Sequence, residues 1–182
     1  MGFLDKFKNK DKTQKQNENA AVYKQMIGLL DVDAEVADKL NRCIDNPFAY
    51  YNENTECYEE RGVEPDVDSN TIIWLGIADA LIKQGKMFEF DHSVELEDFM
   101  YGIRQINRDS LTMDEDALDE DADITQWLET LNTAWMESGV VIAGMDIDSD
   151  SYCVCLITKD VFEKIAVLAE KTGHRIALAQ EL

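Results

Sequence analysis

The stretch that decides the fold runs from Ser138 to Leu182 and reads SGVVIAGMDIDSDSYCVCLITKDVFEKIAVLAEKTGHRIALAQEL. Two apolar runs of strand length, 140–145 and 152–157, flank short Asp and Ser side chains that bond readily to their own backbone in turns. We therefore expect an antiparallel hairpin. Thr158 then caps a helix that ends at Gly173, and residues 174–179 supply a last short strand.

The residues before this stretch predict mostly helices. Apolar residues recur at helical spacing in 21–30, 33–44, 69–82, 95–106 and 124–137, and residues 86–91 predict one more strand. The helix within 69–82 is apolar on most sides, which is typical of a buried helix, and core packing is expected for Trp74, Trp127 and Trp135. The pattern predicts the α+β class, with about six helices packed on a small, mixed, mostly antiparallel sheet of four strands.

Composition divides the chain into a tail and a single domain. Residues 1–20 are polar and rich in lysine, so we expect a flexible basic N-terminal tail followed by one α+β domain over 21–182. Phe3, Leu4 and Phe7 leave membrane contact by the tail as an alternative to a solvated end. The sequence contains no secretory signal and no run of transmembrane length, so a cytoplasmic location is expected.

The chain is strongly acidic, with a formal net charge of −21. Such a charge repels phosphate backbones and attracts basic proteins, so we expect a basic protein partner and no nucleic acid. The densest run is 109–123, which holds eight acidic residues and no basic one. We expect this segment to be a surface loop that cannot pack closely without a partner.

No motif predicts a metal or a cofactor. Asp146, Asp148 and Asp150 have the spacing that opens a calcium loop, but Ser151 and Ile157 stand where that loop needs Gly and a bidentate Glu. The four cysteines include no CxxC pair. We interpret them as buried or half-buried thiols in a reducing compartment.

No motif predicts a catalytic residue either. His92 and His174 are the only histidines, and neither has a nucleophile at motif spacing. His92 follows a predicted strand, and His174 follows the predicted helix end. A catalytic site assembled from distant parts of the chain remains an alternative.

Part of the chain resembles a known family. The segments TIIWLGIADALIKQGKMFEFD (71–91) and ITQWLETLNTAWMESGVVIAGMDIDSDSYCVCLI (124–157), with the helix that follows, resemble a bacterial family classed as a domain of unknown function. Asp148, Ser149, Asp150, Ser151 and Tyr152 carry the match, which extends from Ile72 onward. The resemblance implies a buried helix bearing Trp and a late hairpin, and it implies no chemistry.

These observations favour a non-catalytic acidic binding protein, of the kind of an immunity or inhibitor protein that neutralises a basic toxin or effector enzyme. The alternatives are a scaffold protein tethered by its basic tail and an enzyme with a scattered site. Mimicry of a nucleic acid duplex would require evenly spaced carboxylates on rigid helices, which a loop does not provide. The expected partner-binding residues are Asp114, Glu115, Asp116, Asp119, Glu120, Asp121 and Asp123, followed by Asp148, Asp150 and Tyr152 of the hairpin turn.

Overall fold

The structure is a computed structural model that describes residues 3–107 and 111–182, with side chains from residue 15 onward. The chain divides into two compact units, 1–76 and 77–182. The prediction of one domain over 21–182 stays a prediction, because two compact units can belong to one domain or to two.

The first unit is helical. It contains α1 (Phe3–Leu29), α2 (Ala34–Asp45), α3 (Pro47–Glu53), α4 (Thr55–Glu60) and the first half of α5 (Ser69–Lys83). The hydroxyl of the buried Tyr58 donates to the carbonyl of Ile72 at 2.9 Å, which ties α4 to α5. The described residues hold eight α-helices rather than about six. The difference arises mainly in the region between Asn46 and Glu60, where Pro47 starts a short helix capped by the Asn46 side chain.

Helix α1 continues through the segment expected to be a tail. The helix predicted from residue 21 is confirmed, but its described backbone begins at Phe3. A helical backbone does not test whether the segment moves, so the flexible tail stays a prediction. Residues 1 and 2 lie outside the described residues. None of the helices searched in the described chain has the length and the apolar character needed to cross a membrane.

The second unit is built on a four-stranded sheet with the order β1-β3-β2-β4. Its strands are β1 (Met87–Asp91), β2 (Val140–Met145), β3 (Ser151–Thr158) and β4 (Ile176–Leu178). The predicted hairpin is confirmed, since Val140 pairs with Thr158 and Met145 pairs with Cys153. All the described strand pairs are antiparallel, so the expectation of a mixed sheet is wrong. The α+β class is confirmed.

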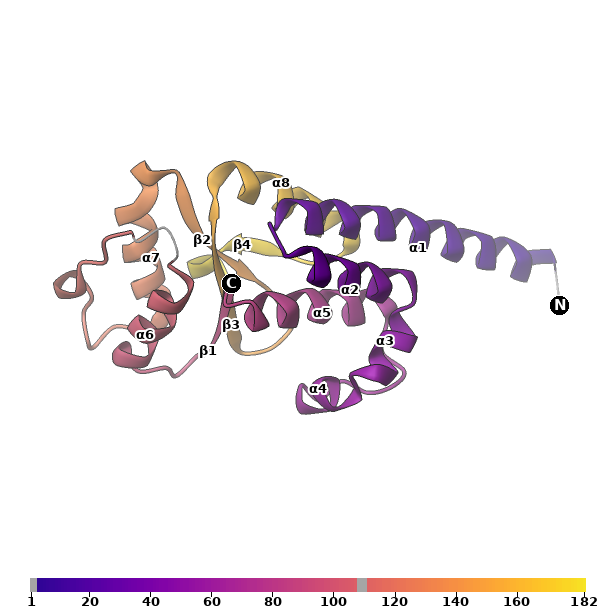
Figure 1. Ribbon diagram of the computed structural model, residues 1–182, viewed down its shortest axis with the longest axis horizontal. Coiled ribbons are helices and arrows are strands. Elements are labelled where there is room, and N and C mark those ends of the chain that lie inside the picture. The colour runs from indigo at the N-terminus through magenta and orange to yellow at the C-terminus, as the bar shows by residue number, and fades with distance from the viewer. Residues whose placement is uncertain (1–2, 108–110) are drawn as a thin grey trace. The chain divides into compact units, whose positions relative to one another are not determined.

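Helices lie on both sides of this sheet (Figure 1). Helices α6 (Leu96–Ile106) and α7 (Ile124–Trp135) cover one face, where Ile142 and Val154 join Phe99, Ile103 and Leu128 in a buried core. Helix α8 (Lys159–Thr172) begins and ends as predicted: the Thr158 hydroxyl accepts from the Val161 N–H, and Gly173 has a φ of +87°. Three short 3₁₀ helices complete the described elements, at Glu115–Ala117, Met136–Ser138 and Ala179–Glu181.

The aromatic and thiol side chains follow the sequence-based expectations. Trp74, Trp127 and Trp135 are buried. The four cysteines form no disulfide; Cys43, Cys153 and Cys155 are buried, and Cys57 is half-buried. Burial raises the pKa of the Cys43 thiol and of the Cys155 thiol to about 12, so both thiols are protonated near neutral pH.

A buried amide completes the hydrogen bonding of strand β2. Strand β4 pairs with residues 143–145 only, and at the next position the chain turns into the 3₁₀ helix Ala179–Glu181. The side chain of Asn132, on α7, supplies the hydrogen-bond partners that β4 does not offer to Ile142. Its Oδ1 accepts from the Ile142 N–H at 2.7 Å, and its Nδ2 donates to the Ile142 carbonyl at 3.1 Å. Nδ2 also donates to Gln180 Oε1 at 2.7 Å. Asn132 therefore joins α7 to the sheet.

We predict that Asn132→Ala lowers the free energy of unfolding by about 2–4 kcal/mol, because it leaves the N–H and the carbonyl of Ile142 buried without this partner. Urea denaturation followed by circular dichroism measures the loss. Gln180→Ala is the control, because it keeps both bonds to Ile142 and is expected to cost about 1 kcal/mol. Equal losses in the two variants would contradict the role assigned to Asn132.

Candidate functional site

The acidic segment, defined here as residues 111–123, presents its carboxylates to solvent. Every one of its seven acidic residues is exposed, and these are the seven expected to steer a partner: Asp114, Glu115, Asp116, Asp119, Glu120, Asp121 and Asp123. Asp109, which belongs to the predicted acidic loop, lies outside the described residues. The structure thus places the predicted carboxylates on one continuous stretch of surface chain.

Two buried indoles hold the backbone of the acidic segment. The Nε1–H of Trp135 donates to the carbonyl of Thr112 at 2.8 Å, and the Nε1–H of Trp127 donates to the carbonyl of Asp119 at 2.7 Å. Both tryptophans belong to α7 and pack in the core. A buried indole N–H needs an acceptor, so each ring is satisfied by a carbonyl of the segment.

Side-chain hydrogen bonds also fix both ends of the acidic segment. At its start, the Asn107 side chain accepts from the Leu111 N–H at 2.9 Å and donates to the Leu111 carbonyl at 2.7 Å. At its end, Asp123 and Gln126 form a capping box at the beginning of α7. The segment is therefore held at both ends as well as between them.

The like charges of this segment remain exposed, but its apolar side chains pack against the core, which the charge pattern did not predict. Leu118 is only 6% exposed and belongs to the core of α6, α7 and the sheet. Leu111, Met113 and Ala122 pack against the same core. Apolar residues lie before, between and after the short acidic runs, so the backbone can approach the core while the carboxylates remain hydrated.

One ion pair links the segment to helix α6. Arg104 Nη2 contacts Glu115 Oε1, and in the described parts of the chain Arg104 is the basic residue that forms an ion pair with the segment. Exposed pairs of this kind contribute little to stability. The pair does neutralise one of the seven carboxylates, so the surface offered to a partner is not uniformly negative.

The hairpin turn is followed by Tyr152 of β3, whose side chain reaches the first turn of α7. Asp148 has a φ of +56° and donates its N–H to Asp146 Oδ1 at 3.0 Å, which is the turn chemistry that the sequence predicts. Asp148 and Asp150 are exposed. Tyr152 is half-buried, and its hydroxyl lies 3.3 Å from Thr125 Oγ1, two residues after the acidic segment ends. This contact links β3 to the residues that follow the acidic segment, and the Tyr152 ring packs against the core.

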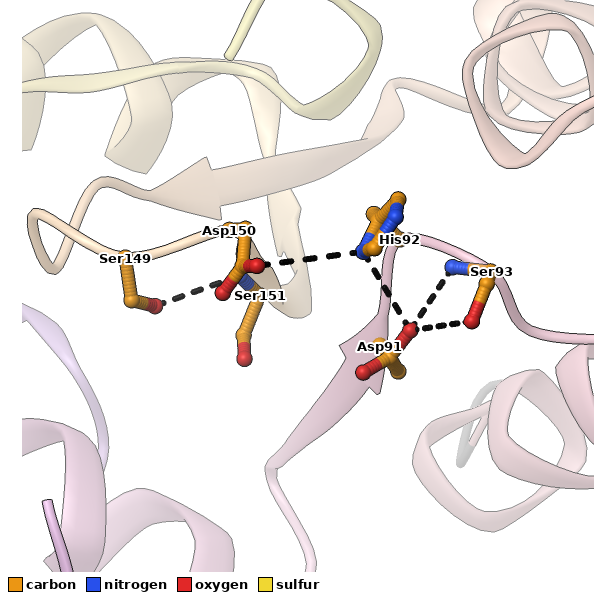
Figure 2. Close-up of polar contacts among 6 residues, drawn as sticks. All are labelled: Asp91, His92, Ser93, Ser149, Asp150 and Ser151. Atoms are coloured by element: carbon orange, nitrogen blue, oxygen red, sulfur yellow. Dashed lines mark hydrogen bonds and ion pairs between the residues drawn. The ribbon is translucent and has the colours of Figure 1, made fainter.

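A second polar cluster forms where β1 ends beside this turn (Figure 2). His92 Nδ1 lies 3.3 Å from Asp91 Oδ1 and 4.0 Å from Asp150 Oδ2. The N–H and the hydroxyl of Ser93 both donate to Asp91 Oδ1, at 2.8 and 2.5 Å. The antiparallel pairing of β1 with β3, which sets Asp91 opposite Ser151, brings these residues together.

This cluster contains Ser, His and Asp but not in a catalytic arrangement. An activated serine needs its hydroxyl on a histidine nitrogen, whereas the Ser93 hydroxyl donates to the carboxylate. The bonds from Ser93 to Asp91 are those of an Asp turn that ends β1. Among the residues searched in the described chain, no three His, Cys, Asp or Glu side chains are placed to hold a metal ion.

Hydrogen bonding shifts the acidity of Asp91. The Ser93 hydroxyl, and after it the Ser93 N–H, hold the pKa of the Asp91 carboxyl below its ordinary value of 3.8, and the nearby His92 lowers it further.

The sequence did not predict the residues that anchor the acidic segment: Asn107, Arg104 and the indoles of Trp127 and Trp135. Nothing in the sequence marks these contacts, because they depend on which backbone groups arrive beside each side chain.

A comparison with protein families identifies a family for most of the chain. The family model described as a domain of unknown function (DUF6630) matches residues 22–179. This range begins well before Ile72, where the resemblance noted from the sequence begins, and it includes the acidic segment and the hairpin turn. No curated protein and no solved structure matches the chain.

We predict that Ser93→Ala raises the pKa of Asp91 toward its ordinary value, because the substitution removes the largest lowering contact and keeps the N–H. A depressed carboxyl pKa stabilises the fold above the unfolded-state value and loses that effect as pH falls through the folded-state value. The variant should therefore be less stable than the unaltered protein above about pH 4, and this difference should disappear as pH falls through the folded-state pKa of Asp91. Carbon-detected NMR titration measures the pKa, with Ser149→Ala as control; an unchanged Asp91 midpoint would refute the assignment.

We predict that Trp135→Phe loosens the start of the acidic segment, because phenylalanine keeps most of the ring packing and lacks the N–H that binds Thr112. The expected cost in the free energy of unfolding is about 1–3 kcal/mol. Hydrogen exchange by mass spectrometry should show faster exchange in peptides covering 111–118 and little change in β2 and β3. Unaltered exchange in 111–118 would show that the indole bond does not hold the segment.

Proposed function

We propose that this chain, which belongs to the family described as a domain of unknown function (DUF6630), is a non-catalytic protein that binds and neutralises a basic protein, such as a toxin or an effector enzyme. One observation carries the proposal: seven exposed carboxylates lie on a segment whose backbone is anchored by two buried indoles. The role is that of an immunity or inhibitor protein.

The negative charge of the acidic segment supports the proposal, because it would speed the encounter with a basic partner. A surface of one sign raises the association rate of an oppositely charged partner, and salt weakens the effect. The net charge of −21 gives the same sign to the long-range field of the whole chain. Such a field also disfavours nucleic acid as the partner.

The anchoring of the segment supports affinity. A segment that is already ordered loses less conformational entropy when a partner binds than a disordered loop of the same charge. Two indole bonds, the Asn107 amide and the Asp123 capping box hold the backbone before any partner arrives. The carboxylates are therefore presented from a fixed backbone.

The polar cluster at the end of β1 supports a non-catalytic role, because its serine hydroxyl is engaged by Asp91. The four thiols without disulfides are in keeping with the reducing conditions of the cytoplasm, where we propose that the protein acts.

The partner can be identified by using the full chain as bait in a lysate of the native cell, followed by mass spectrometry of the captured proteins.

We predict that neutralising the seven carboxylates of the acidic segment, by Asp→Asn and Glu→Gln, slows association with the captured partner about tenfold or more at low salt. The dependence of the on-rate on ionic strength should also become flatter. Stopped-flow measurements at two or more salt concentrations provide both quantities. The result follows from the loss of long-range attraction, while short-range contacts mainly set the off-rate.

The chain offers a control with the same charge change on the other unit. Seven acidic residues between 53 and 68 are exposed and can be neutralised in the same way: Glu53, Glu56, Glu59, Glu60, Glu64, Asp66 and Asp68. This variant should associate faster than the first one. Equal on-rates for both variants would assign the effect to net charge alone. If the variant neutralised in the acidic segment associated as fast as the unaltered protein, the acidic segment would be rejected as a binding surface.

A further inference from the structure

The outer face of helix α6 carries an exposed aromatic ring. Tyr101 is 56% exposed, and its ring meets that of Phe88 edge to face, with centroids 6.4 Å apart at an angle of 81°. Phe88 is half-buried and belongs to β1, the strand at one edge of the sheet. Scattered exposed apolar residues need no explanation, but a ring supported by a second ring is a more rigid feature.

A close approach between α6 and β1 creates this pair. At Gly102, next to Tyr101, an added Cβ would lie 2.8 Å from Phe88 Cδ1 and closer still to the ring of Phe90. Any larger residue would push the helix away from the strand. Because Gly102 allows this approach, the Phe88 ring lies beside the helix and supports the ring of Tyr101. An aromatic side chain held in this way loses little entropy on binding.

Charged groups surround Tyr101 on the same helix. Glu97 and Asp98 precede it by one turn and are exposed, and Arg104 follows it by one turn. Arg104 is held by its ion pair with Glu115 of the acidic segment. An apolar partner would have to cover these charges at a high cost in desolvation, whereas a cationic side chain would meet both the ring and the carboxylates.

We propose that the Tyr101–Phe88 pair is the anchor point for an arginine side chain of the basic partner, which rests on the proposed function. The guanidinium stacks on the Tyr101 face and binds Glu97 or Asp98 through its N–H groups. The net charge of −21 and the carboxylates beside the ring select a basic occupant. The aromatic pair, rather than the surrounding carboxylates, defines the site.

The test uses the full chain and a hexa-arginine peptide as probe, with the dissociation constant measured by calorimetry at low salt. Tyr101→Ala should weaken binding about three- to fivefold, and Tyr101→Phe should retain the wild-type value within about twofold. Met136→Ala is the matched control, because Met136 is 69% exposed on the same unit and lies outside α6. Amide spectra of each variant verify that it folds.

Two results would overturn the anchor: no binding of hexa-arginine to the unaltered chain, or equal affinity for the unaltered chain and Tyr101→Ala. A hexalysine peptide at the same salt should lose less affinity than hexa-arginine when Tyr101 is removed, since lysine stacks less well. Equal losses for the two peptides would contradict arginine as the occupant. The proposed function fails separately, when neutralising the acidic segment leaves the on-rate to the captured partner unchanged.

Discussion

Hydrogen bonds from the side chains of α7 to backbone groups outside the helix hold the second unit together. Asn132 binds both backbone groups of Ile142 where strand β4 ends, and Trp127 and Trp135 bind two carbonyls of the acidic segment. Buried polar groups need partners, so these bonds determine where the sheet and the segment can lie relative to the helix. The core packing of the unit and its candidate surface thus depend on the same helix.

The acidic segment shows how a stretch of like charges can be ordered. Repulsion between neighbouring carboxylates is weak when each is hydrated, and apolar side chains between them pack in the core. Leu118 and the two indoles then fix the backbone from the side of the core. The arrangement separates two roles: apolar residues give the segment its position, and acidic residues give the surface its charge.

Local signals predicted the elements of the second unit well. The hairpin, the Thr158 cap and the end of α8 at Gly173 depend on residues near each other in the chain, so their chemistry is visible in the sequence. The short helices α3 and α4 were missed because seven and six residues are too few to show a helical period, and the buried, stacked rings of Tyr51 and Tyr58 that hold them pack together only in the folded unit. Their stability comes from packing as well as from propensity.

The sequence by itself determined the α+β class, the late hairpin and the seven carboxylates of the candidate surface, because periodicity, turn chemistry and charge are local properties. Only the tertiary structure decided that the sheet is antiparallel throughout, that β1 lies at its edge, and that the acidic segment is anchored. The physical reason is that strand pairing and indole bonding join residues distant in the chain. A donor such as the Trp135 N–H needs an acceptor when it is buried, but which carbonyl supplies it depends on how the whole unit packs.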